Sequence, residues 1–267
     1  MRLSKMHGAL NDFIVVDSRA NPLPRPGDFA KFACDRRAGI GADGVLVIGP
    51  SASADVTMRV LNADGSEAEM CGNGVRCIAR YVDALRAGEN PASGARRDDC
   101  SIQTIAGRIY TTIVERGEIY RVRVNMGAPS VRHARTSSDG AAVVSVGNPH
   151  IVRFERALDD VDIARYGEAM QRDTAFPRGI NVHVAVIDSA AKEIRMKHYE
   201  RGAGETMACG TGAVAAAAAA IAQGTIVSPV RVFVPGGELL VEWDGSGDAF
   251  MTGPAVHVFE TVVRWPG

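Results

Sequence analysis

A short cysteine motif occurs twice in this chain of 267 residues, and about half of the chain length separates the two copies. The first copy is MCGNG at 70–74 and the second is ACGTG at 208–212, and a helical run follows each of them. A repeat at this distance indicates two halves of similar structure. We therefore expect two α+β domains with a cleft between them, each domain contributing one cysteine.

Short runs rich in valine and isoleucine dominate the rest of the chain, and Gly, Pro or Asp separates several of them. These runs predict β-strands at 12–17, 44–48, 55–61, 108–114, 118–124, 143–146, 150–154, 181–187, 193–199, 230–234 and 238–243. Helical patterns predict four helices, at 28–36, 72–86, 159–172 and 210–223. The polar segment 86–99 contains Gly, Pro and Ser and predicts a loop.

The net charge of −1 gives the chain no general attraction to nucleic acid or to anionic membranes. Hydrophobic residues make up 46% and charged residues 23%, a balance that is typical of a globular protein with a large core. The N-terminus has no long apolar run that would predict a signal peptide, and the longest apolar tract, at 213–222, is too short to span a bilayer. We therefore expect neither nucleic acid nor a membrane as a partner.

Five cysteines, an odd number at irregular spacing, argue against a set of disulfide bonds and indicate a reducing cytoplasm. The sequence has no CxxC pair and no paired Cys/His spacing, so it predicts no structural metal site. A single cysteine is usually a small buried hydrophobic residue, and this is our interpretation of Cys34, Cys77 and Cys100. Cys71 and Cys209 differ because they form a matched pair at two helix starts.

The start of a helix changes the chemistry of a thiol. Free backbone N–H groups and the positive end of the helix dipole favour a thiolate, so we expect a cysteine there to have a pKa below the free value of about 8.5. The same N–H groups bind a carboxylate, and the glycines after each cysteine let a ligand approach the backbone. Two such sites facing each other suit the inversion of a carbon stereocentre, because one thiolate removes a proton and the other thiol delivers one to the opposite face. The fixed donors stabilise the carbanion without a metal or pyridoxal phosphate.

Several polar residues accompany the two motifs. Glu200 and Arg201 follow a predicted strand just before the second motif, a position that favours a ligand role over an ordinary surface ion pair. Asparagines at the edges of strand-like runs either bind a ligand or shape a turn; they are Asn11, Asn62, Asn148 and Asn181. His150 lies in the turn-like Asn-Pro-His segment, and the other five histidines share no spacing and receive no role. The run GIGADG at 39–44 lacks the lysine of a phosphate loop, so nucleotide binding is not predicted.

Three longer segments carry a resemblance to a known family. They are KMHGALNDFIVVD at 5–17, NADGSEAEMCGNGVR at 62–76 and YERGAGETMACGTG at 199–212. They are similar to the opening motif and the two active-site signatures of diaminopimelate epimerases. Shorter matches follow in the order of that family, at 39–44, 148–150, 179–182, 235–237 and 251–253. The resemblance therefore covers nearly the whole chain.

The resemblance implies two pseudo-symmetric domains, each a β-barrel-like sheet around a central helix, with the active-site cleft between them. We expect residues 1–116 with 256–267 to form the domain that holds Cys71, and residues 117–255 to form the domain that holds Cys209. The implied activity is cofactor-independent interconversion of LL- and meso-2,6-diaminopimelate, an isomerase step in lysine and peptidoglycan precursor synthesis. The implied protein is a cytoplasmic homodimer.

The resemblance also implies roles for single residues. Cys71 and Cys209 match the base and acid of the family, and His150 and Glu200 match positions important for the work of the thiols. The loop backbone that holds the reacting carboxylate matches Gly72, Asn73, Gly210 and Thr211. The residues that bind the substrate, chiefly at its distal amino acid end, match Asn11, Asn62, Asn148, Asn181, Glu200 and Arg201. Gly44 departs from members that carry a substrate-contacting glutamine there, so this contact is absent or replaced.

Three alternatives stay open at this point. Proline and hydroxyproline racemases share the fold and the two-thiol chemistry, but they resemble CGHG at the first motif and lack the Glu200-Arg201 pair. A non-catalytic amino-acid-binding protein would not need both cysteines. A thiol redox protein has poor support because the sequence contains no CxxC pair.

Overall fold

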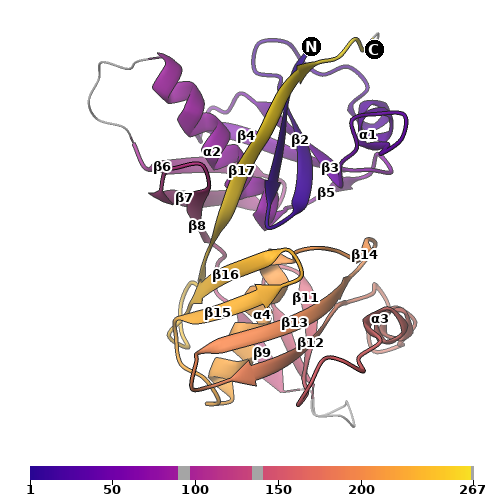
Figure 1. Cartoon of the computed structure of the whole chain (residues 1–267), viewed down its shortest axis with the longest axis vertical. Helices are drawn as coiled ribbons and strands as arrows, with labels where there is room; N and C mark the ends of the chain where they lie inside the picture. The colour runs from indigo at the N-terminus through magenta and orange to yellow at the C-terminus, as the bar shows by residue number, and fades with distance from the viewer. Residues whose placement is uncertain (90–96, 134–140, 266–267) are drawn as a thin grey trace. The chain divides into compact units, whose positions relative to one another are not determined.

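The computed structural model describes residues 1–89, 97–133 and 141–265, which form two compact units of mixed α and β structure (Figure 1). Unit 1 consists of Met1–Val124 with Gly253–Gly267, and unit 2 consists of Asn125–Thr252. The α+β class expected from the sequence is confirmed. Among the described residues, every helix is too short or too polar to span a membrane.

In unit 1 the strands form a sheet around helix α2. Its elements are β1 (Arg2–Gly8), β2 (Asn11–Asp17), α1 (Pro26–Cys34), β3 (Gly44–Gly49), β4 (Val56–Asn62), β5 (Glu67–Ala68), α2 (Gly72–Glu89), β6 (Asp99–Thr104), β7 (Gly107–Glu115) and β8 (Tyr120–Asn125). The strands pair in the order β1, β2, β3, β4, β6, β7 and β8, and β17 (Phe250–Val262) pairs with both β1 and β8. This pairing closes the sheet into a barrel, and α2 packs against six of its strands.

In unit 2 a second sheet surrounds helix α4. Its elements are β9 (Ser130–His133), β10 (Ala142–Ser145), β11 (Pro149–Phe154), α3 (Ile163–Gln171), β12 (Asn181–Asp188), β13 (Glu193–Glu200), β14 (Gly204–Glu205), α4 (Gly210–Ala222), β15 (Val230–Val234) and β16 (Gly237–Glu242). The strands pair in the order β9, β10, β11, β12, β13, β15 and β16, followed by the first residues of β17.

The two units repeat the same series of connections. In unit 1 the pairs β2–β3 and β4–β6 are parallel, and in unit 2 the pairs β11–β12 and β13–β15 are parallel. In each unit a two-residue strand, β5 or β14, comes directly before the cysteine motif, and the central helix, α2 or α4, comes directly after it. Each cysteine motif therefore has the same position in its own unit.

Small side chains let α4 lie inside the sheet of unit 2 (Figure 1). Every residue of Ala213–Ala220 is completely buried. Alanine is the best helix former, and a helix that is apolar on all sides belongs in a core. The short methyl groups bring the strands close to the helix axis, so the first turn of α4 is held firmly in place.

The four predicted helices and the eleven predicted strands are confirmed, with ends that differ by a few residues. The predicted loop at 86–99 begins too early because α2 continues to Glu89, and residues 90–96 lie outside the described part of the chain. Strand patterns missed β1, β5, β6, β9, β14 and β17, and the longest of these, β17, contains Gly253 and Pro254. Pro254 lies between the residues that pair with β16 and those that pair with β1, so its missing N–H costs no hydrogen bond to either strand.

The boundaries of the units differ from the predicted domain limits. The predicted limit at 116/117 would separate β7 from β8, whereas unit 1 extends to Val124. The physical reason is the antiparallel pairing of β8 with β7, which includes Val124 opposite Thr111. The chain also returns to unit 1 at Gly253 rather than at residue 256.

Candidate active site

Cys71 stands at the start of the central helix of unit 1. Helix α2 begins at Gly72, and the carbonyl of Cys71 accepts a hydrogen bond of 2.9 Å from the N–H of Val75. The N–H of Gly74 donates to the thiol sulfur at 3.4 Å, and the cysteine is only partly buried. The sulfur therefore lies against the backbone donors of a helix start, the environment that the sequence predicts.

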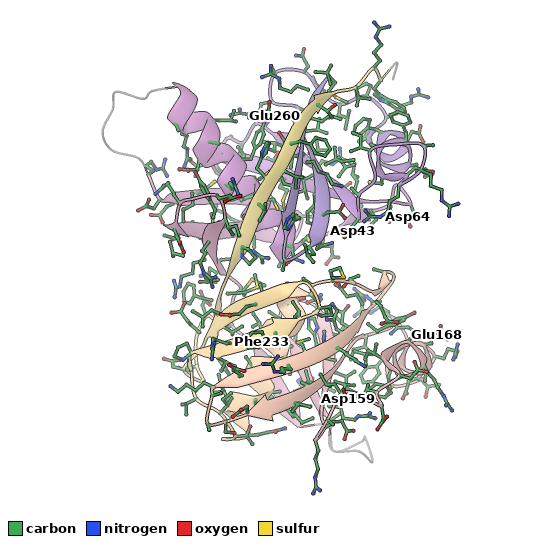
Figure 2. The ribbon with its side chains drawn as sticks, in the orientation of Figure 1. Asp43, Asp64, Asp159, Glu168, Phe233 and Glu260 are labelled. Carbon is green, nitrogen blue, oxygen red and sulfur yellow. The ribbon has the colours of Figure 1, made fainter. Side chains whose placement is uncertain are left out.

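Two asparagines lie beside this thiol. The sulfur of Cys71 lies 3.8 Å from Oδ1 of Asn11, and Nδ2 of Asn73 donates to the same oxygen at 3.0 Å. Asp43, labelled in Figure 2, holds Asn11 in place by accepting from its Nδ2 at 2.7 Å. The sequence assigned no role to Asp43. The parallel pairing of β2 with β3 brings Asp43 next to Asn11. The sequence feature that could have indicated Asp43 is an acidic residue in a glycine-rich turn just before a strand.

Arg76 is fully buried next to the first turn of α2. Its guanidinium donates to Oδ1 of Asn73 at 2.9 Å, to the carbonyl of Pro254 at 3.0 Å and to the carbonyl of Gly72 at 3.4 Å. Burial lowers the pKa of Arg76 to about 10, so the side chain stays charged at neutral pH. These bonds orient Asn73 with its Nδ2 toward Asn11, and they fix the helix start that follows Cys71.

Asn62 takes a structural role at the end of β4. Its Nδ2 donates to Oγ of Ser66 at 2.9 Å, and its N–H donates to the carbonyl of Ser66 at 2.8 Å. These bonds close the turn before β5, as asparagines in turns commonly do. Asn62 is also exposed and pairs with Gly44 in the β3–β4 register, which places it at the same end of the sheet as Asp43.

Cys209 stands at the N-cap position of α4 in unit 2. Its carbonyl accepts from the N–H of Ala213 at 2.9 Å, and its sulfur lies 3.6 Å from the hydroxyl oxygen of Thr211. The side chain is buried, with 3% of its surface exposed. Cys209 is therefore much less exposed than a thiol at a solvated helix start.

The expected lowering of the thiol pKa is wrong for Cys209. Burial raises the pKa of the Cys209 thiol well above its ordinary value, and the carboxylate of Glu200 raises it further. The Thr211 hydroxyl and the N–H of Gly212 favour the thiolate but do not outweigh the loss of water. Cys209 is therefore a protonated thiol at neutral pH, suited to deliver a proton.

His150 is completely buried between two partners. Its Nε2 lies 2.7 Å from Oδ1 of Asn148, and its Nδ1 lies 2.8 Å from Nε2 of His183. Burial, and then the positive charge of Arg201, lower the pKa of His150 to about 3, so the ring is neutral. Because Asn148 Oδ1 accepts, His150 carries its proton on Nε2, and its Nδ1 accepts the Nε2 proton of His183.

His183 and His198 are residues that the sequence analysis missed. They stand opposite each other in the β12–β13 pairing, and His150 is one strand away on β11. Thr206 donates to the carboxylate of Glu200, so its oxygen accepts from Nε2 of His198 at 3.0 Å. The three histidines form a buried row behind Cys209, and only the register of three strands could reveal it.

Asn181 and Arg201 are joined at the ends of β12 and β13. Nδ2 of Asn181 donates to the carbonyl of Pro149 at 3.0 Å, and its Oδ1 accepts from the backbone N–H of Arg201 at 3.0 Å. The guanidinium of Arg201 is exposed and donates to the carbonyl of Arg178 at 3.3 Å. Asn181 thus fixes the turn from which Arg201 reaches into solvent.

The predicted site residues fall into two groups, one in each unit. In unit 1, hydrogen bonds or chain adjacency join Asn11, Cys71, Gly72 and Asn73, whereas Asn62 bonds to Ser66 instead. In unit 2, they join Asn148, His150, Asn181, Glu200, Arg201, Cys209, Gly210 and Thr211. Each group combines a thiol with the first turn of a buried helix.

A family model described as diaminopimelate epimerase matches residues 3–132 and 142–258. The chain belongs to the diaminopimelate epimerase family. Diaminopimelate epimerases of Desulfitobacterium hafniense and Desulforudis audaxviator are 39% and 41% identical to it; the alignments cover 98% and 97% of this chain and 98% of each relative. Diaminopimelate epimerases are isomerases, and the predicted enzyme class is confirmed.

Solved structures share the fold of this diaminopimelate epimerase family member. A PhzF-family phenazine biosynthesis protein of Bacillus anthracis superposes with a TM-score of 0.75 at 17% identity, covering 99% of both chains. A probable proline racemase of Agrobacterium radiobacter superposes with a TM-score of 0.70 at 17% identity, covering 98% of this chain and 92% of the other. At this level of identity the likeness shows a common fold only.

Replacing Gly212 by alanine is expected to lower kcat/KM of this epimerase family member about tenfold or more. A Cβ atom at Gly212 would lie 2.8 Å from Nδ1 and 2.9 Å from Nε2 of His183, so the ring or the first turn of α4 must move. That turn carries Cys209, and a small displacement of a reacting group is costly. Steady-state kinetics of Gly212→Ala measures the effect.

Gly88 supplies the matched control, because it is also a helix glycine and a Cβ atom there would meet no atom within 4 Å. Gly88→Ala should keep the activity and raise the free energy of unfolding by roughly 0.5–1 kcal/mol. Equal kinetics for the two variants would show that the contact of His183 with Gly212 does not position Cys209.

Proposed function

We propose that the protein inverts one α-carbon of 2,6-diaminopimelate and so interconverts its LL and meso forms. The observation that carries this proposal is the pair of thiols, each placed against the first turn of a buried helix, one in each unit. The similar proteins from Desulfitobacterium and Desulforudis are named for diaminopimelate, and this is the substrate that we propose. The α-proton of an amino acid is very weakly acidic, so a thiolate can remove it only if the resulting carbanion is stabilised. The backbone donors of the two helix starts provide that stabilisation.

The proton transfers follow from the environments of the two thiols. Cys209 is buried beside Glu200 and enters the reaction as a thiol, hence as the acid. Cys71 is then the base in that direction. The C–H bond of the α-carbon breaks and its proton bonds to the sulfur of Cys71, while the S–H proton of Cys209 bonds to the opposite face of the carbon. The products are the inverted amino acid, a Cys71 thiol and a Cys209 thiolate, from which the reverse reaction starts.

The first turns of α2 and α4 are proposed to bind the reacting carboxylate. The backbone N–H groups of these first turns belong to Gly72 and Asn73 in unit 1, and to Gly210 and Thr211 in unit 2. The same donors stabilise the negative charge that moves onto the carboxylate when the α-proton leaves. This dual use explains why the thiol and the carboxylate site share one loop.

Residues beside the thiols are proposed to position the substrate and the acid. Glu200 is close enough to the Cys209 thiol to raise its pKa, and His150 holds Asn148 by the hydrogen bond from its Nε2. Substrate binding at the distal end is proposed for Asn11, Asn62, Asn148, Asn181, Glu200 and Arg201. A turn fixed by Asn181 presents Arg201, the exposed cation of this set.

Arg201→Ala is expected to raise KM for diaminopimelate about tenfold or more, with a smaller change in kcat. A guanidinium forms two parallel hydrogen bonds with a carboxylate, and the distal carboxylate does not take part in the chemistry. Arg201→Lys should give an intermediate KM, and Arg172→Ala, an exposed arginine after α3, should leave both constants unchanged. An unchanged KM for Arg201→Ala would remove Arg201 from the binding site.

The proposed reaction also has consequences for the arrangement of the domains and for the assembly. We propose that the two thiols face each other across a cleft between the units, because inversion requires an acid and a base on opposite faces of one carbon. We assign the N-terminal epimerase domain to the Cys71 unit and the C-terminal epimerase domain to the Cys209 unit. We also propose a homodimer that works in the reducing cytoplasm, since the reaction needs both thiols free.

The decisive experiment follows the α-proton. Reduced protein without added cofactor is incubated in deuterated water with LL-diaminopimelate, and α-proton loss is followed by NMR while the meso product is separated on a chiral column. L-Proline is tested in parallel, since a proline racemase shares the fold. Deuterium incorporation with inversion of diaminopimelate alone supports the proposal. Exchange with proline alone would favour the racemase, and no exchange with either would overturn the proposed reaction.

A further inference from the structure

A threonine and a histidine lie beside Glu200 on the hairpin that β13 and β14 form. Glu200 is the last residue of β13, and Thr206 directly follows β14. The hydroxyl of Thr206 donates to Oε1 of Glu200, and Nε2 of His198 lies 3.0 Å from the hydroxyl oxygen of Thr206. The three side chains therefore form one chain of hydrogen bonds that ends on a carboxylate.

The protons of this chain run in one direction. A carboxylate accepts hydrogen bonds and does not donate them, so the Thr206 hydroxyl uses its proton on Glu200. The hydroxyl oxygen then accepts from His198, whose ring carries its proton on Nε2. Burial lowers the pKa of His198 to about 4, so the ring is neutral at pH 7 and keeps a single proton for this bond. The bond from His198 leaves the Thr206 hydroxyl proton pointed at Glu200.

The carboxylate at the end of the chain acts on the thiol of Cys209. It lies in hydrogen-bonding reach of that thiol, and its charge and its hydrogen bond both raise the pKa of Cys209. Glu200 is only partly buried, and a glutamate side chain has several rotatable bonds. Without the Thr206 hydroxyl the carboxylate would be free to turn away from Cys209 toward water.

We propose that Thr206 and His198 are positioning residues that hold the carboxylate of Glu200 against Cys209 and so keep Cys209 ready to act as the acid. Thr206 acts on Glu200 directly, and His198 acts through Thr206, because hydrogen bonds in a row polarise and orient one another. This inference rests on the proposed function, in which Cys209 delivers a proton to the α-carbon. Neither residue is assigned a contact with the substrate.

Thr206→Val is the first test, because valine has nearly the shape of threonine but lacks the hydroxyl. We expect kcat/KM for the inversion to fall about tenfold, and Thr206→Ser, which keeps the hydroxyl, to stay within about twofold of the wild type. Thr104→Val is the matched control, since the Thr104 hydroxyl donates at 2.8 Å to the carbonyl of Gly107 in unit 1. It should leave the kinetics unchanged. Wild-type kinetics of Thr206→Val would overturn the proposal.

A double-mutant cycle shows whether Thr206 acts through Glu200. A Glu200→Ala protein has no carboxylate to hold, so the addition of Thr206→Val should change its kcat/KM by less than about twofold. His198→Leu removes the N–H donor of the chain, and it should lower kcat/KM about threefold alone but less than about twofold when Thr206→Val is already present. A tenfold loss on adding Thr206→Val to Glu200→Ala would overturn the proposed route through Glu200.

A measurement on the free protein decides the question where Glu200→Ala has too little activity for the cycle. Glutamate carboxyl groups labelled with carbon-13 are titrated by NMR, and the resonance that Glu200→Gln lacks belongs to Glu200. In Thr206→Val the carboxylate faces a methyl group in place of a donor, so its titration midpoint should rise by about half a pH unit or more. Thr206→Ser and Thr104→Val should keep the wild-type midpoint.

The NMR titration also separates this inference from the proposed function, because it needs no substrate. An unchanged Glu200 midpoint in folded Thr206→Val, with folding checked by circular dichroism, would overturn the positioning role even if the wild-type protein inverts diaminopimelate. A raised midpoint together with a wild-type protein that inverts nothing would support the contact with Glu200 and overturn the proposed reaction.

Discussion

Cys71→Ala and Cys209→Ala are each expected to lower the rate of diaminopimelate inversion by about 10²–10⁴-fold or more. Each thiol serves one face of the α-carbon, so neither can replace the other. Both variants should fold, because an alanine fits the space of a cysteine and the backbone bonds of Cys71 and Cys209 to Val75 and Ala213 do not involve the side chain. Chiral separation of products after long incubation, with circular dichroism as a test of folding, measures the effect.

Cys100→Ala is the control for the loss of a cysteine as such. Cys100 is a free cysteine buried in β6 with 3% of its surface exposed, and it stands within a strand rather than at a helix start. Its replacement should leave kcat unchanged and cost only a modest amount of stability. Inversion by either Cys71→Ala or Cys209→Ala at a rate near that of Cys100→Ala would exclude the two-thiol mechanism.

Arg76→Ala is expected to lower the free energy of unfolding of unit 1 by roughly 3 kcal/mol or more. The guanidinium is completely buried and donates to Asn73, Pro254 and Gly72, so its removal leaves a cavity and three acceptors without their donor. Each buried acceptor without a partner costs about 1–3 kcal/mol. The loss also frees Asn73, so activity should fall under conditions where the variant is still folded.

The chain has two tryptophans, one in each unit, so the unfolding of unit 1 can be observed separately. Trp265 packs on Phe29 in unit 1, whereas Trp243 belongs to unit 2. In a Trp243→Phe background, urea unfolding followed by fluorescence therefore reports on Trp265 alone. Arg59→Ala is the control, since Arg59 forms an exposed ion pair with Glu67 that is worth at most about 1 kcal/mol. Equal stability of the Arg76→Ala and Arg59→Ala proteins would contradict the structural role of Arg76.

Much of the fold was predictable because its signals are local. The run of alanines in α4 and the Val- and Ile-rich strands mark their secondary structure within windows of a few residues, and the structure confirms them. β17 escaped this approach since Gly253 and Pro254 interrupt its pattern. Its identity as a strand depends on partners, β1 and β16, that are distant in sequence.

The site residues of the two units also include some that local sequence predicts and some that depend on distant segments. The local sequence was enough to place the two thiols at helix starts, because each motif precedes a helical run and a helix start is a local feature. It could not determine the row of His150, His183 and His198, whose members meet only through the register of three strands. Nor could it show that Asp43 holds Asn11, which depends on the parallel pairing of β2 with β3.

The protonation of Cys209 shows the difference most directly. The sequence determined that this thiol lies at the positive end of a helix, and from that alone a low pKa follows. Packing around Cys209 reverses this direction and raises the pKa, because it removes the thiol from water and places Glu200 beside it. The position of a group along the chain is set by local sequence, whereas its solvation and its charged neighbours are set by all the segments that pack around it.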